Sequence, residues 1–311
     1  MSRTVHELDR SEDLRAAPAD PHPPEPPPAA EGPAGVPAPG PRTSFARLHD
    51  RDAPLLLPNA WDYASAAALV ADGFEAVGTT SLGVAAAAGL PDGSAATAEA
   101  TLALARQLGG VGFLFSVDAE GGFSDDPARV AEVARQLWAA GAAGINIEDG
   151  RGDGTLAPVE LHMAKIAAVK AAVPELFVNA RTDTYWLGCR QDETEARLAA
   201  YQRAGANGVF VPGLADPAII GVLTARLDVP VNILHTPTGP GLAELAVLGV
   251  RRVSLGSLLY RTALGAAVAA ARAVRDGQQP VGNGSVPSYA EVQALSAPRA
   301  RVTSAGPPAG G

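Results

Sequence analysis

The chain of 311 residues is acidic, with a formal net charge of −9, and 47% of its residues are apolar. The negative charge argues against binding of nucleic acid through its phosphates. The chain has no run of about 18 apolar residues to span a bilayer, and its N-terminus lacks the basic and then apolar pattern of a secretory signal. We therefore expect a cytoplasmic protein without a membrane or nucleic-acid partner.

Two residue types are scarce, and each scarcity excludes a class of chemistry. The single cysteine, Cys189, forms neither an internal disulfide nor a thiolate metal cluster. The two lysines, Lys165 and Lys170, both fall within one helical pattern. Chemistry through a Schiff base needs a lysine at the end of a barrel strand, so lysine-dependent aldolases and pyridoxal-phosphate enzymes are excluded.

The two ends of the chain differ in composition from its middle. Residues 1–42 hold eleven of the 27 prolines and show no apolar period, which predicts a disordered Pro-rich arm. A short helix over about 43–52 leads into the central region, 43–277. Residues 278–311 combine a Gly/Pro-rich link, a weak helix near 289–294 and a disordered end.

The central region alternates short apolar segments with longer helical patterns. The expected strands are 55–60, 75–81, 113–120, 144–149, 177–183, 208–212, 231–235 and 252–256. The expected helices are 62–73, 96–108, 127–140, 158–172, 192–204, 217–227, 242–248 and 259–276. This alternation predicts an α/β protein with a (β/α)8 TIM barrel. A doubly wound open sheet is the alternative, but the sequence has neither a Gly-x-Gly-x-x-Gly after the first strand nor a phosphate-loop motif.

The third expected strand ends in two carboxylates, Asp118 and Glu120, and two glycines follow. Residues i and i+2 of a strand share a face, so both side chains point the same way. Two such charges repel each other unless a cation or a proton lies between them. No basic residue lies nearby in the sequence, so a hard divalent cation bound by oxygen ligands is the expected partner.

Other polar residues fall at the carboxyl ends of the expected strands, where the active site of a barrel lies. They are Asn59, Asp62, Thr79, Thr80, Ser81, Glu148, Asp149, Arg181, Asp183, Asn232 and His235. Asp92 adds a carboxylate in the loop after the second strand. An acidic cluster beside Arg181 suits an anionic substrate that a metal ion holds from one side and the guanidinium from the other.

Several of these residues also have a purely structural interpretation. Helix capping accounts for Asp62, Asp125 and Asp126. Pairing with arginines in loops accounts for Asp149 and Asp183. The five histidines lack the spacing of a zinc site, which leaves the carboxylates as the candidate metal ligands.

Five short motifs stand in a recognisable order and spacing. They are Pro58-Asn-Ala-Trp-Asp62, Gly89-Leu-Pro-Asp92, Val117-Asp-Ala-Glu-Gly-Gly122, Gly144-Ile-Asn-Ile-Glu-Asp149 and Ala180-Arg-Thr-Asp183. Together they resemble the isocitrate lyase/phosphoenolpyruvate mutase superfamily over residues 50 to about 275. The resemblance implies a Mg²⁺-dependent (β/α)8 barrel that makes or breaks a carbon–carbon or carbon–phosphorus bond next to a carboxylate, through an enolate held on the metal.

The resemblance also implies a ligand set for the metal. Asp118 matches the principal Mg²⁺ contact, and Mn²⁺ is an expected substitute for Mg²⁺. Glu120, Glu148 and Asp92 are implied to join Asp118 directly or through water.

Substrate contacts follow from the same resemblance. Thr80, Ser81 and Leu82 match the segment whose hydroxyl and backbone amides hold the substrate carboxylate. Arg181 matches the arginine that neutralises the developing negative charge, so Arg181 and Thr80 are the implied catalytic residues. Members of the superfamily exchange a C-terminal helix between subunits, which implies a homodimer or a homotetramer.

The chain departs from the named members of the superfamily at three places. The lyases carry a loop with a catalytic cysteine after the fourth strand, where this chain reads Asp149-Gly-Arg-Gly-Asp-Gly-Thr155, and Cys189 does not match that cysteine. Phosphoenolpyruvate mutases have an aspartate at the position of Glu120 and a histidine near that of Pro212. The named activities therefore do not transfer directly.

The resulting expectation is a Mg²⁺-dependent lyase or mutase that acts on a carbon–carbon bond in a small 2-oxo or 2-hydroxy acid, with the loop 150–156 as its lid. One alternative is carbon–phosphorus chemistry on a phosphonate, as in a phosphonomutase or a phosphonopyruvate hydrolase, for which Thr80 supplies the hydroxyl. The other alternative is a catalytically silent barrel that binds a ligand or a partner, because its lid lacks cysteine and histidine.

Overall fold

The computed structural model describes residues 43–110, 112–279 and 286–296. The predicted arm 1–42 and the last residues of the predicted C-terminal extension lie outside the described residues. The strands are β1 (Leu55–Leu57), β2 (Asn59–Ala60), β3 (Ala76–Thr79), β4 (Leu114–Asp118), β5 (Gly144–Glu148), β6 (Phe177–Arg181), β7 (Gly208–Val211), β8 (Val231–Leu234) and β9 (Arg252–Ser254). The helices are α1 (Ser44–Arg47), α2 (Tyr63–Ala71), α3 (Ser81–Ala88), α4 (Ala98–Gly109), α5 (Pro127–Ala139), α6 (Val159–Ala172), α7 (Thr194–Arg203), α8 (Pro217–Arg226), α9 (Leu242–Val247), α10 (Leu258–Arg275) and α11 (Tyr289–Leu295), with a 3-10 turn at Gln191–Glu193.

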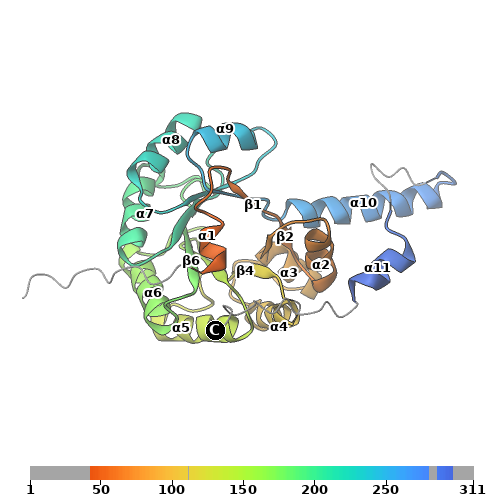
Figure 1. Cartoon of the computed structure of the whole chain (residues 1–311), viewed down its shortest axis with the longest axis horizontal. Helices are drawn as coiled ribbons and strands as arrows, with labels where there is room; N and C mark the ends of the chain where they lie inside the picture. Colours follow the sequence, from red (N-terminus) through yellow and green to blue (C-terminus); the bar gives the residue numbers. More distant parts are fainter. Residues whose placement is uncertain (1–42, 111, 280–285, 297–311) are drawn as a thin grey trace, which may run out of the picture. The chain divides into compact units, whose positions relative to one another are not determined.

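The strands are parallel and form a nearly closed barrel, with helices on its outer side (Figure 1). Consecutive strands pair from β3 to β9, β1 pairs with β9, and β2 pairs with β3. β1 and β2 are the two halves of the first predicted strand, which Pro58 interrupts because proline has no N–H to donate. The predicted TIM barrel is therefore confirmed, and the open doubly wound sheet is excluded.

Helix α3 corrects the sequence prediction, which places a loop between the second strand and residue 96. Residues 85–88 are all alanine, the residue type with the highest helix propensity. Gly89 ends the helix with a left-handed backbone, φ +68°. Almost every residue of α3 is apolar or small, so it has no polar stripe by which a periodicity could be recognised.

Residues of the strands alternate between the helix-covered outside of the barrel and its interior. Outward-facing apolar side chains pack against the helices in one large core. Inward-facing positions are unusually polar, and in register they include Asn146, Asn179, Asn232 and Arg252. Polar barrel residues need partners inside the protein, and these partners connect the interior to the site described below.

The amino ends of the strands are covered by α1 and the residues after it. Phe45 and His49 pack with Phe177 at the start of β6, and the His49 ring stacks on Phe177 with centroids 4.4 Å apart. Within the described ranges, no helix combines the length and the apolarity needed to cross a bilayer.

Candidate active site

Charged side chains from several strands converge on a cavity of about 450 Å³ at the carboxyl ends of the strands. The charged residues that line it are Asp92, Asp118, Glu148, Arg151, Arg181, Asp183 and Arg261. Its apolar lining comprises Leu82, Trp186, Leu187, Phe210, Pro212 and Leu234. Barrel enzymes carry their active sites at this end, and the mixture of acidic, basic and apolar groups is typical of a site for a small anion with a carbon skeleton.

The first turn of α3 opens into this cavity beside Asp118. Thr80 is the residue that precedes the helix, and it is buried. The N–H of Ser81 donates to Oδ2 of Asp118 at 3.3 Å, and both residues line the cavity with Leu82. The first N–H groups of a helix have no partner within the helix and favour anions. The predicted carboxylate-binding segment 80–82 is therefore the start of a helix, whereas the sequence predicted a strand up to Ser81 and a loop after it.

Arg181 is fixed between two carboxylates. Its register neighbour on β5 is Glu148, whose Oε2 lies 2.6 Å from Nη1 of Arg181. Asp183 accepts hydrogen bonds from Nε at 2.6 Å and from Nη2 at 3.2 Å, and Phe210 lies under the guanidinium at 5.7 Å. Burial alone would lower the pKa of Arg181, but Glu148, Asp183 and Asp118 together raise it, so the guanidinium stays charged. The predicted pairing of Asp183 with an arginine is confirmed.

Burial and neighbouring negative charge act on the acidic groups of the cavity. Burial raises the pKa of Glu148 well above its ordinary value, and Asp183, Asp118 and Asp92 add to this effect against the opposing charge of Arg181. Burial also raises the pKa of Asp92, again with a contribution from Asp118. Carboxylates that destabilise each other's charged forms are stabilised by a cation.

Glu120 lies differently from the other three predicted metal ligands. It is not part of the cavity lining, and its side chain accepts hydrogen bonds from the N–H of Ala95 at 2.9 Å and from the Thr97 hydroxyl at 2.5 Å. Glu120 and Ala95 both adopt left-handed backbone conformations, with φ of 47° and 61°. Such conformations are uncommon for residues other than glycine and cluster at functional sites. Glu120 therefore anchors the loop that carries Asp92, and its contact with a metal ion stays a prediction.

Asn146 lies on the floor of the cavity and was not recognised from the sequence as a site residue. Its Oδ1 accepts hydrogen bonds from Nδ2 of Asn179 at 2.9 Å and from Nη2 of Arg252 at 3.3 Å. Because a guanidinium has only donors, the amide oxygen of Asn146 must face Arg252. The Asn146 side chain lines the cavity, so its Nδ2 is left as a donor on the cavity side. The motif 144–149 contains Asn146 but does not indicate this role, since the orientation of the amide comes from two other strands.

The loop 150–156 forms a short hairpin over the cavity, with an antiparallel bridge between Gly150 and Leu156. A Cβ atom on Gly150 would lie 2.1 Å from Oδ2 of Asp183, and one on Gly152 would lie 2.7 Å from the carbonyl oxygen of Gly93. Both positions therefore require glycine. The close approach of Gly152 to Gly93 brings the predicted lid against the loop of Asp92.

Charged residues beneath this hairpin hold it in place. Arg151 of the hairpin and Lys165 of α6 both contact Asp125, at 2.7 and 2.9 Å. Helix capping was predicted for Asp125, but Asp126 is the residue that caps α5. Asp125 was therefore assigned wrongly, because two cations from more distant parts of the chain compete for its carboxylate. The predicted cap Asp62 is confirmed.

The donor set fits a hard divalent cation such as Mg²⁺. Oδ1 of Asp118 is buried and has no hydrogen-bond partner in the described part of the chain, which is the condition of an oxygen that awaits a ligand. Across residues 43–110, 112–279 and 286–296, however, no three His, Cys, Asp or Glu side chains already form a metal-binding group. Mg²⁺ commonly takes one or two carboxylates and completes its shell with water and substrate oxygens, so Asp118 with Glu148 or Asp92 suffices.

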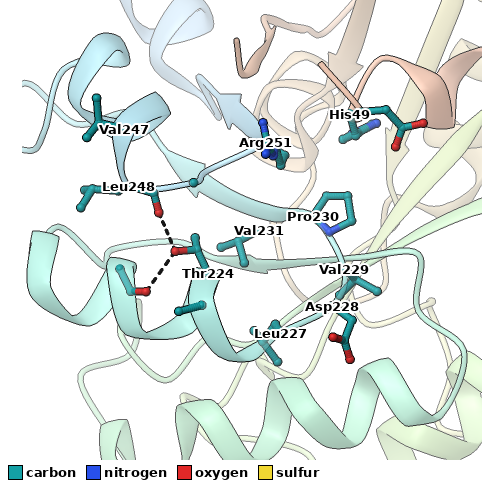
Figure 2. Close-up of a pocket in the computed structure, with 14 residues that line it drawn as sticks. His49, Thr224, Leu227, Asp228, Val229, Pro230, Val231, Val247, Leu248 and Arg251 are labelled. Carbon is teal, nitrogen blue, oxygen red and sulfur yellow. Dashed lines mark hydrogen bonds between the residues drawn. The ribbon is translucent and has the colours of Figure 1, made fainter. Parts of the chain in front are cut away.

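A second, larger cavity of about 720 Å³ lies at the opposite end, where residues that precede β8 and β9 line it (Figure 2). Apart from Nε2 of His49, which has no partner among the described residues, its polar side chains are engaged with the protein itself. The Thr224 hydroxyl donates to the Leu248 carbonyl at 2.5 Å, Asp228 accepts from Gln202 at 2.8 Å, and Arg251 donates to the Arg51 carbonyl at 2.8 Å. This cavity is therefore not the candidate active site, although it is the larger one.

Most of the predicted site residues thus lie together. The cavity lining brings together Thr80, Ser81, Leu82, Asp92, Asp118, Glu148 and Arg181. Among the residues implied to bind the metal or the substrate, Glu120 is the one that the lining does not include. The lining also leaves out the strand-end residues Asp62, Thr79, Asp149, Asn232 and His235. Asn146, Trp186 and Arg261 line the cavity and were not predicted. Asn146 falls within a quoted motif but inside the barrel, whereas Trp186 and Arg261 belong to no motif.

Comparisons with known proteins agree with this geometry. An uncharacterized protein of Mycobacterium tuberculosis is 49% identical over 253 residues, which cover 81% of this chain and 95% of the relative. An oxaloacetate decarboxylase of Pseudomonas fluorescens is 35% identical over 201 residues, which cover 60% of this chain and 67% of the relative. A solved complex of a phosphonopyruvate hydrolase with oxalate and Mg²⁺ is 26% identical, has a TM-score of 0.70, and matches over 81% of this chain and 93% of that chain.

The family model described as phosphoenolpyruvate phosphomutase matches residues 45–275, which include every strand of the barrel. The predicted resemblance to the superfamily is thereby confirmed. Its known members include lyases, mutases and hydrolases that cleave carbon–carbon or carbon–phosphorus bonds. The chain belongs to the phosphoenolpyruvate mutase family of the isocitrate lyase superfamily, and it is an enzyme.

Proposed function

We propose that this enzyme is a Mg²⁺-dependent lyase that breaks a carbon–carbon bond next to the carboxylate of a small 2-oxo or 2-hydroxy acid. One observation carries the proposal: a buried oxygen of Asp118 without a donor lies beside the N-terminus of α3 and near the fixed guanidinium of Arg181. The site thus brings together an oxygen ligand for a metal, a helix N-terminus that can bind a carboxylate, and a positive charge that can stabilise an enolate.

Asp118, Glu148 and Asp92 are the residues that hold the metal ion in this proposal. When bound, Mg²⁺ supplies the positive charge that stabilises an enolate as the bond breaks. The N–H groups of Ser81 and Leu82, with the Thr80 hydroxyl, bind and orient the substrate carboxylate. Helix N-termini favour such a charge by about 0.3–1 kcal/mol each and more where water is excluded.

Arg181 stabilises the negative charge that develops on the substrate. Its two carboxylate partners hold the guanidinium in one orientation before the substrate binds, so little reorganisation is needed during the reaction. The hairpin 150–156 excludes water from the cavity through its contact with the loop of Asp92. We assign no cysteine or histidine to the reaction.

One observation favours carbon–carbon over carbon–phosphorus cleavage. Pro212 lines the cavity near the position where the resembled phosphomutases carry a histidine. Carbon–phosphorus cleavage is the second candidate, because Thr80 lines the same cavity and offers a hydroxyl.

The test is a substrate panel of oxaloacetate, dimethylmalate, methylisocitrate and phosphonopyruvate, each with excess Mg²⁺ and with EDTA. We expect Mg²⁺-dependent release of a cleaved product from at least one of the first three acids above the metal-only rate. Phosphorus NMR on phosphonopyruvate decides the second candidate. Mg²⁺-dependent binding without turnover of any acid would contradict both and support the silent barrel.

Three further predictions from the sequence accompany this proposal. Mn²⁺ is expected to replace Mg²⁺, and the protein is expected to be cytoplasmic. A homodimer or homotetramer is supported by α10, where Leu264 and Val268 are exposed and no residue of this described helix is buried. Size-exclusion chromatography with light scattering tests the oligomeric state.

A further inference from the structure

Arg252, the first residue of β9, carries a charge inside the barrel with which no carboxylate of the described residues pairs. Its Nε and Nη1 have no hydrogen-bond partner in that part of the chain. Arg197 is equally buried, but it forms an ion pair with Asp149 at 3.1 Å. An unpaired buried charge lowers the stability of a protein, so the position of Arg252 in the fold points to a use in binding.

Asn146 connects Arg252 to the active-site cavity. Nη2 of Arg252 donates to Oδ1 of Asn146 at 3.3 Å, and Asn146 is the register partner of Asp118 on the next strand. Neighbouring strands lie about 4.8 Å apart, and both Asn146 and Asp118 line the cavity. The guanidinium of Arg252 therefore lies one side chain away from the expected metal ligand.

The charges around the cavity form two groups. Glu148 and Asp183 pair with Arg181. Asp118 forms no ion pair within the described ranges, and its negative charge acts on Arg252 instead. Burial lowers the pKa of Arg252 to about 9, and the charge of Asp118 raises it against this effect. Asp118 and Arg252 thus balance each other's charge without direct contact.

A divalent cation on Asp118 disturbs this balance. It brings two positive charges near a guanidinium that keeps its own charge at neutral pH, and like charges in a poorly solvated site repel each other strongly. Asp92 offers a further negative charge, but this residue is exposed, so water screens its charge. An anionic ligand beside the metal ion removes the excess of positive charge.

We infer that the charge of Arg252 weakens the binding of Mg²⁺ alone and strengthens that of the anionic substrate, so that the two bind as a pair. By thermodynamic linkage, each increases the affinity of the site for the other by the same factor. The inference rests on the proposed function, in which Asp118 binds the metal ion. It adds a regulation of that site: the metal ion is held tightly only when the substrate is present.

Calorimetric titration of the full chain with Mg²⁺, alone and with oxalate as an anionic probe, measures this linkage after correction for the Mg²⁺–oxalate complex in solution. In Arg252→Met we expect the dissociation constant of Mg²⁺ alone to fall about 10- to 100-fold, as for the removal of a like charge from a partly buried site. The gain in affinity that oxalate causes should shrink. Arg252→Gln, which also lacks the charge, should behave in the same way. The matched control, Arg251→Met, removes a charge at the other end of the barrel and should leave both values unchanged.

A second pair of variants separates the charge of Arg252 from its effect on the orientation of the Asn146 amide. Asn146→Ala has no amide to orient, so the addition of Arg252→Met should still tighten Mg²⁺ binding by a similar factor. Loss of the effect in this pair, or an unchanged or weaker affinity for Mg²⁺ in both folded variants of Arg252, overturns the inference alone. Urea denaturation verifies folding. If the unaltered protein binds no Mg²⁺ even with oxalate, the proposed function fails, and the inference fails with it.

Discussion

The ends of the neighbouring strands β4 and β5 hold two buried aspartates in opposite surroundings. Asp149 is fully buried, and its carboxylate accepts hydrogen bonds from the Thr182 hydroxyl, the Asp183 N–H, Arg197 and Tyr201, all at 2.7–3.1 Å. Both oxygens of this carboxylate have donors, and Arg197 compensates its charge. The carboxylate of Asp149 is thus fully paired without a ligand.

Asp118 is almost as buried, but its surroundings are incomplete. One oxygen accepts the Ser81 N–H at 3.3 Å, and the other has no donor within the part of the chain that the structure describes. A buried acceptor without a partner costs about 1–3 kcal/mol, which is an unfavourable arrangement unless a ligand later occupies it. The comparison teaches that burial alone does not separate structural from functional carboxylates, whereas the satisfaction of their hydrogen bonds does.

The largest expected effect concerns Asp118, the carboxylate with an oxygen that has no donor. Asp118→Asn removes the charge that a metal ion needs, and we expect kcat/KM to fall by about 10³-fold or more, equivalent to several kcal/mol of electrostatic stabilisation. Calorimetric titration with Mg²⁺ should show the loss of binding, while the free energy of unfolding does not decrease. Asp228→Asn, at the opposite end of the barrel, is the control and should retain both. Unchanged Mg²⁺ affinity in Asp118→Asn would contradict the assignment.

The second prediction concerns the buried ion pair between Asp149 and Arg197. Asp149→Asn leaves the buried Arg197 with the partly exposed Glu193 as its remaining counter-charge, so we expect the free energy of unfolding to fall by about 3 kcal/mol. Urea denaturation measures this loss. The double variant with Arg197→Met should recover part of it, because the buried charge that lost its main partner is then gone. A single variant as stable as the parent protein would show that the pair is not needed.

A smaller effect is expected on the cavity floor. Asn146→Asp keeps the acceptor for Arg252 and Asn179 but loses the Nδ2 donor, so we expect kcat/KM to fall about 10- to 100-fold, as for one lost hydrogen bond in a buried site. The matched control is Asn232→Asp, at a barrel position outside the cavity lining. Steady-state kinetics on both variants, with thermal melts to verify folding, decide the role; equal losses would point to a general disturbance of the barrel.

The smallest effect concerns His162, which packs edge-on against Tyr201 in the Asp149 region with ring centroids 4.5 Å apart. Burial, together with the charges of Lys165 and Arg197, lowers the pKa of His162 from 6.5 to about 4 against the opposing effect of Asp149. Below pH 6.5 the unfolded chain therefore binds a proton that the folded chain excludes, and stability falls as the pH decreases toward 4.

The slope attributable to His162 reaches about 1.4 kcal/mol per pH unit at most. His162→Leu should show a shallower loss of stability between pH 6.5 and 4 in urea denaturation, and no change of slope above pH 7. Burial lowers the pKa of His49 in the same way, to about 3, so the variant keeps part of the pH dependence. Parallel curves for the two proteins would disprove the contribution of His162.

The sequence by itself determined the barrel and much of the acidic site. Alternating apolar strands and capped helices have local causes: hydrophobic period, capping residues and glycine stops. Asp118, Glu148 and Arg181 could be predicted because a residue at the carboxyl end of a barrel strand has its place fixed by topology. Asp183 follows the same strand as Arg181, and its predicted pairing with an arginine is confirmed.

Only the tertiary structure decided what depends on contacts between distant segments. Helix α3 has no polar face from which a helical period could be predicted. Asp125 forms ion pairs with Arg151 and Lys165 and does not cap the helix that follows it. The orientation of Asn146 is set from β6 and β9. The Glu120 side chain accepts a hydrogen bond from the N–H of Ala95, which lies 25 residues earlier in the chain. The backbone of Glu120 is left-handed, so its side chain does not follow the strand alternation that predicts the same direction as for Asp118. Such details arise from packing and charge pairing across the fold, which no local pattern of residues encodes.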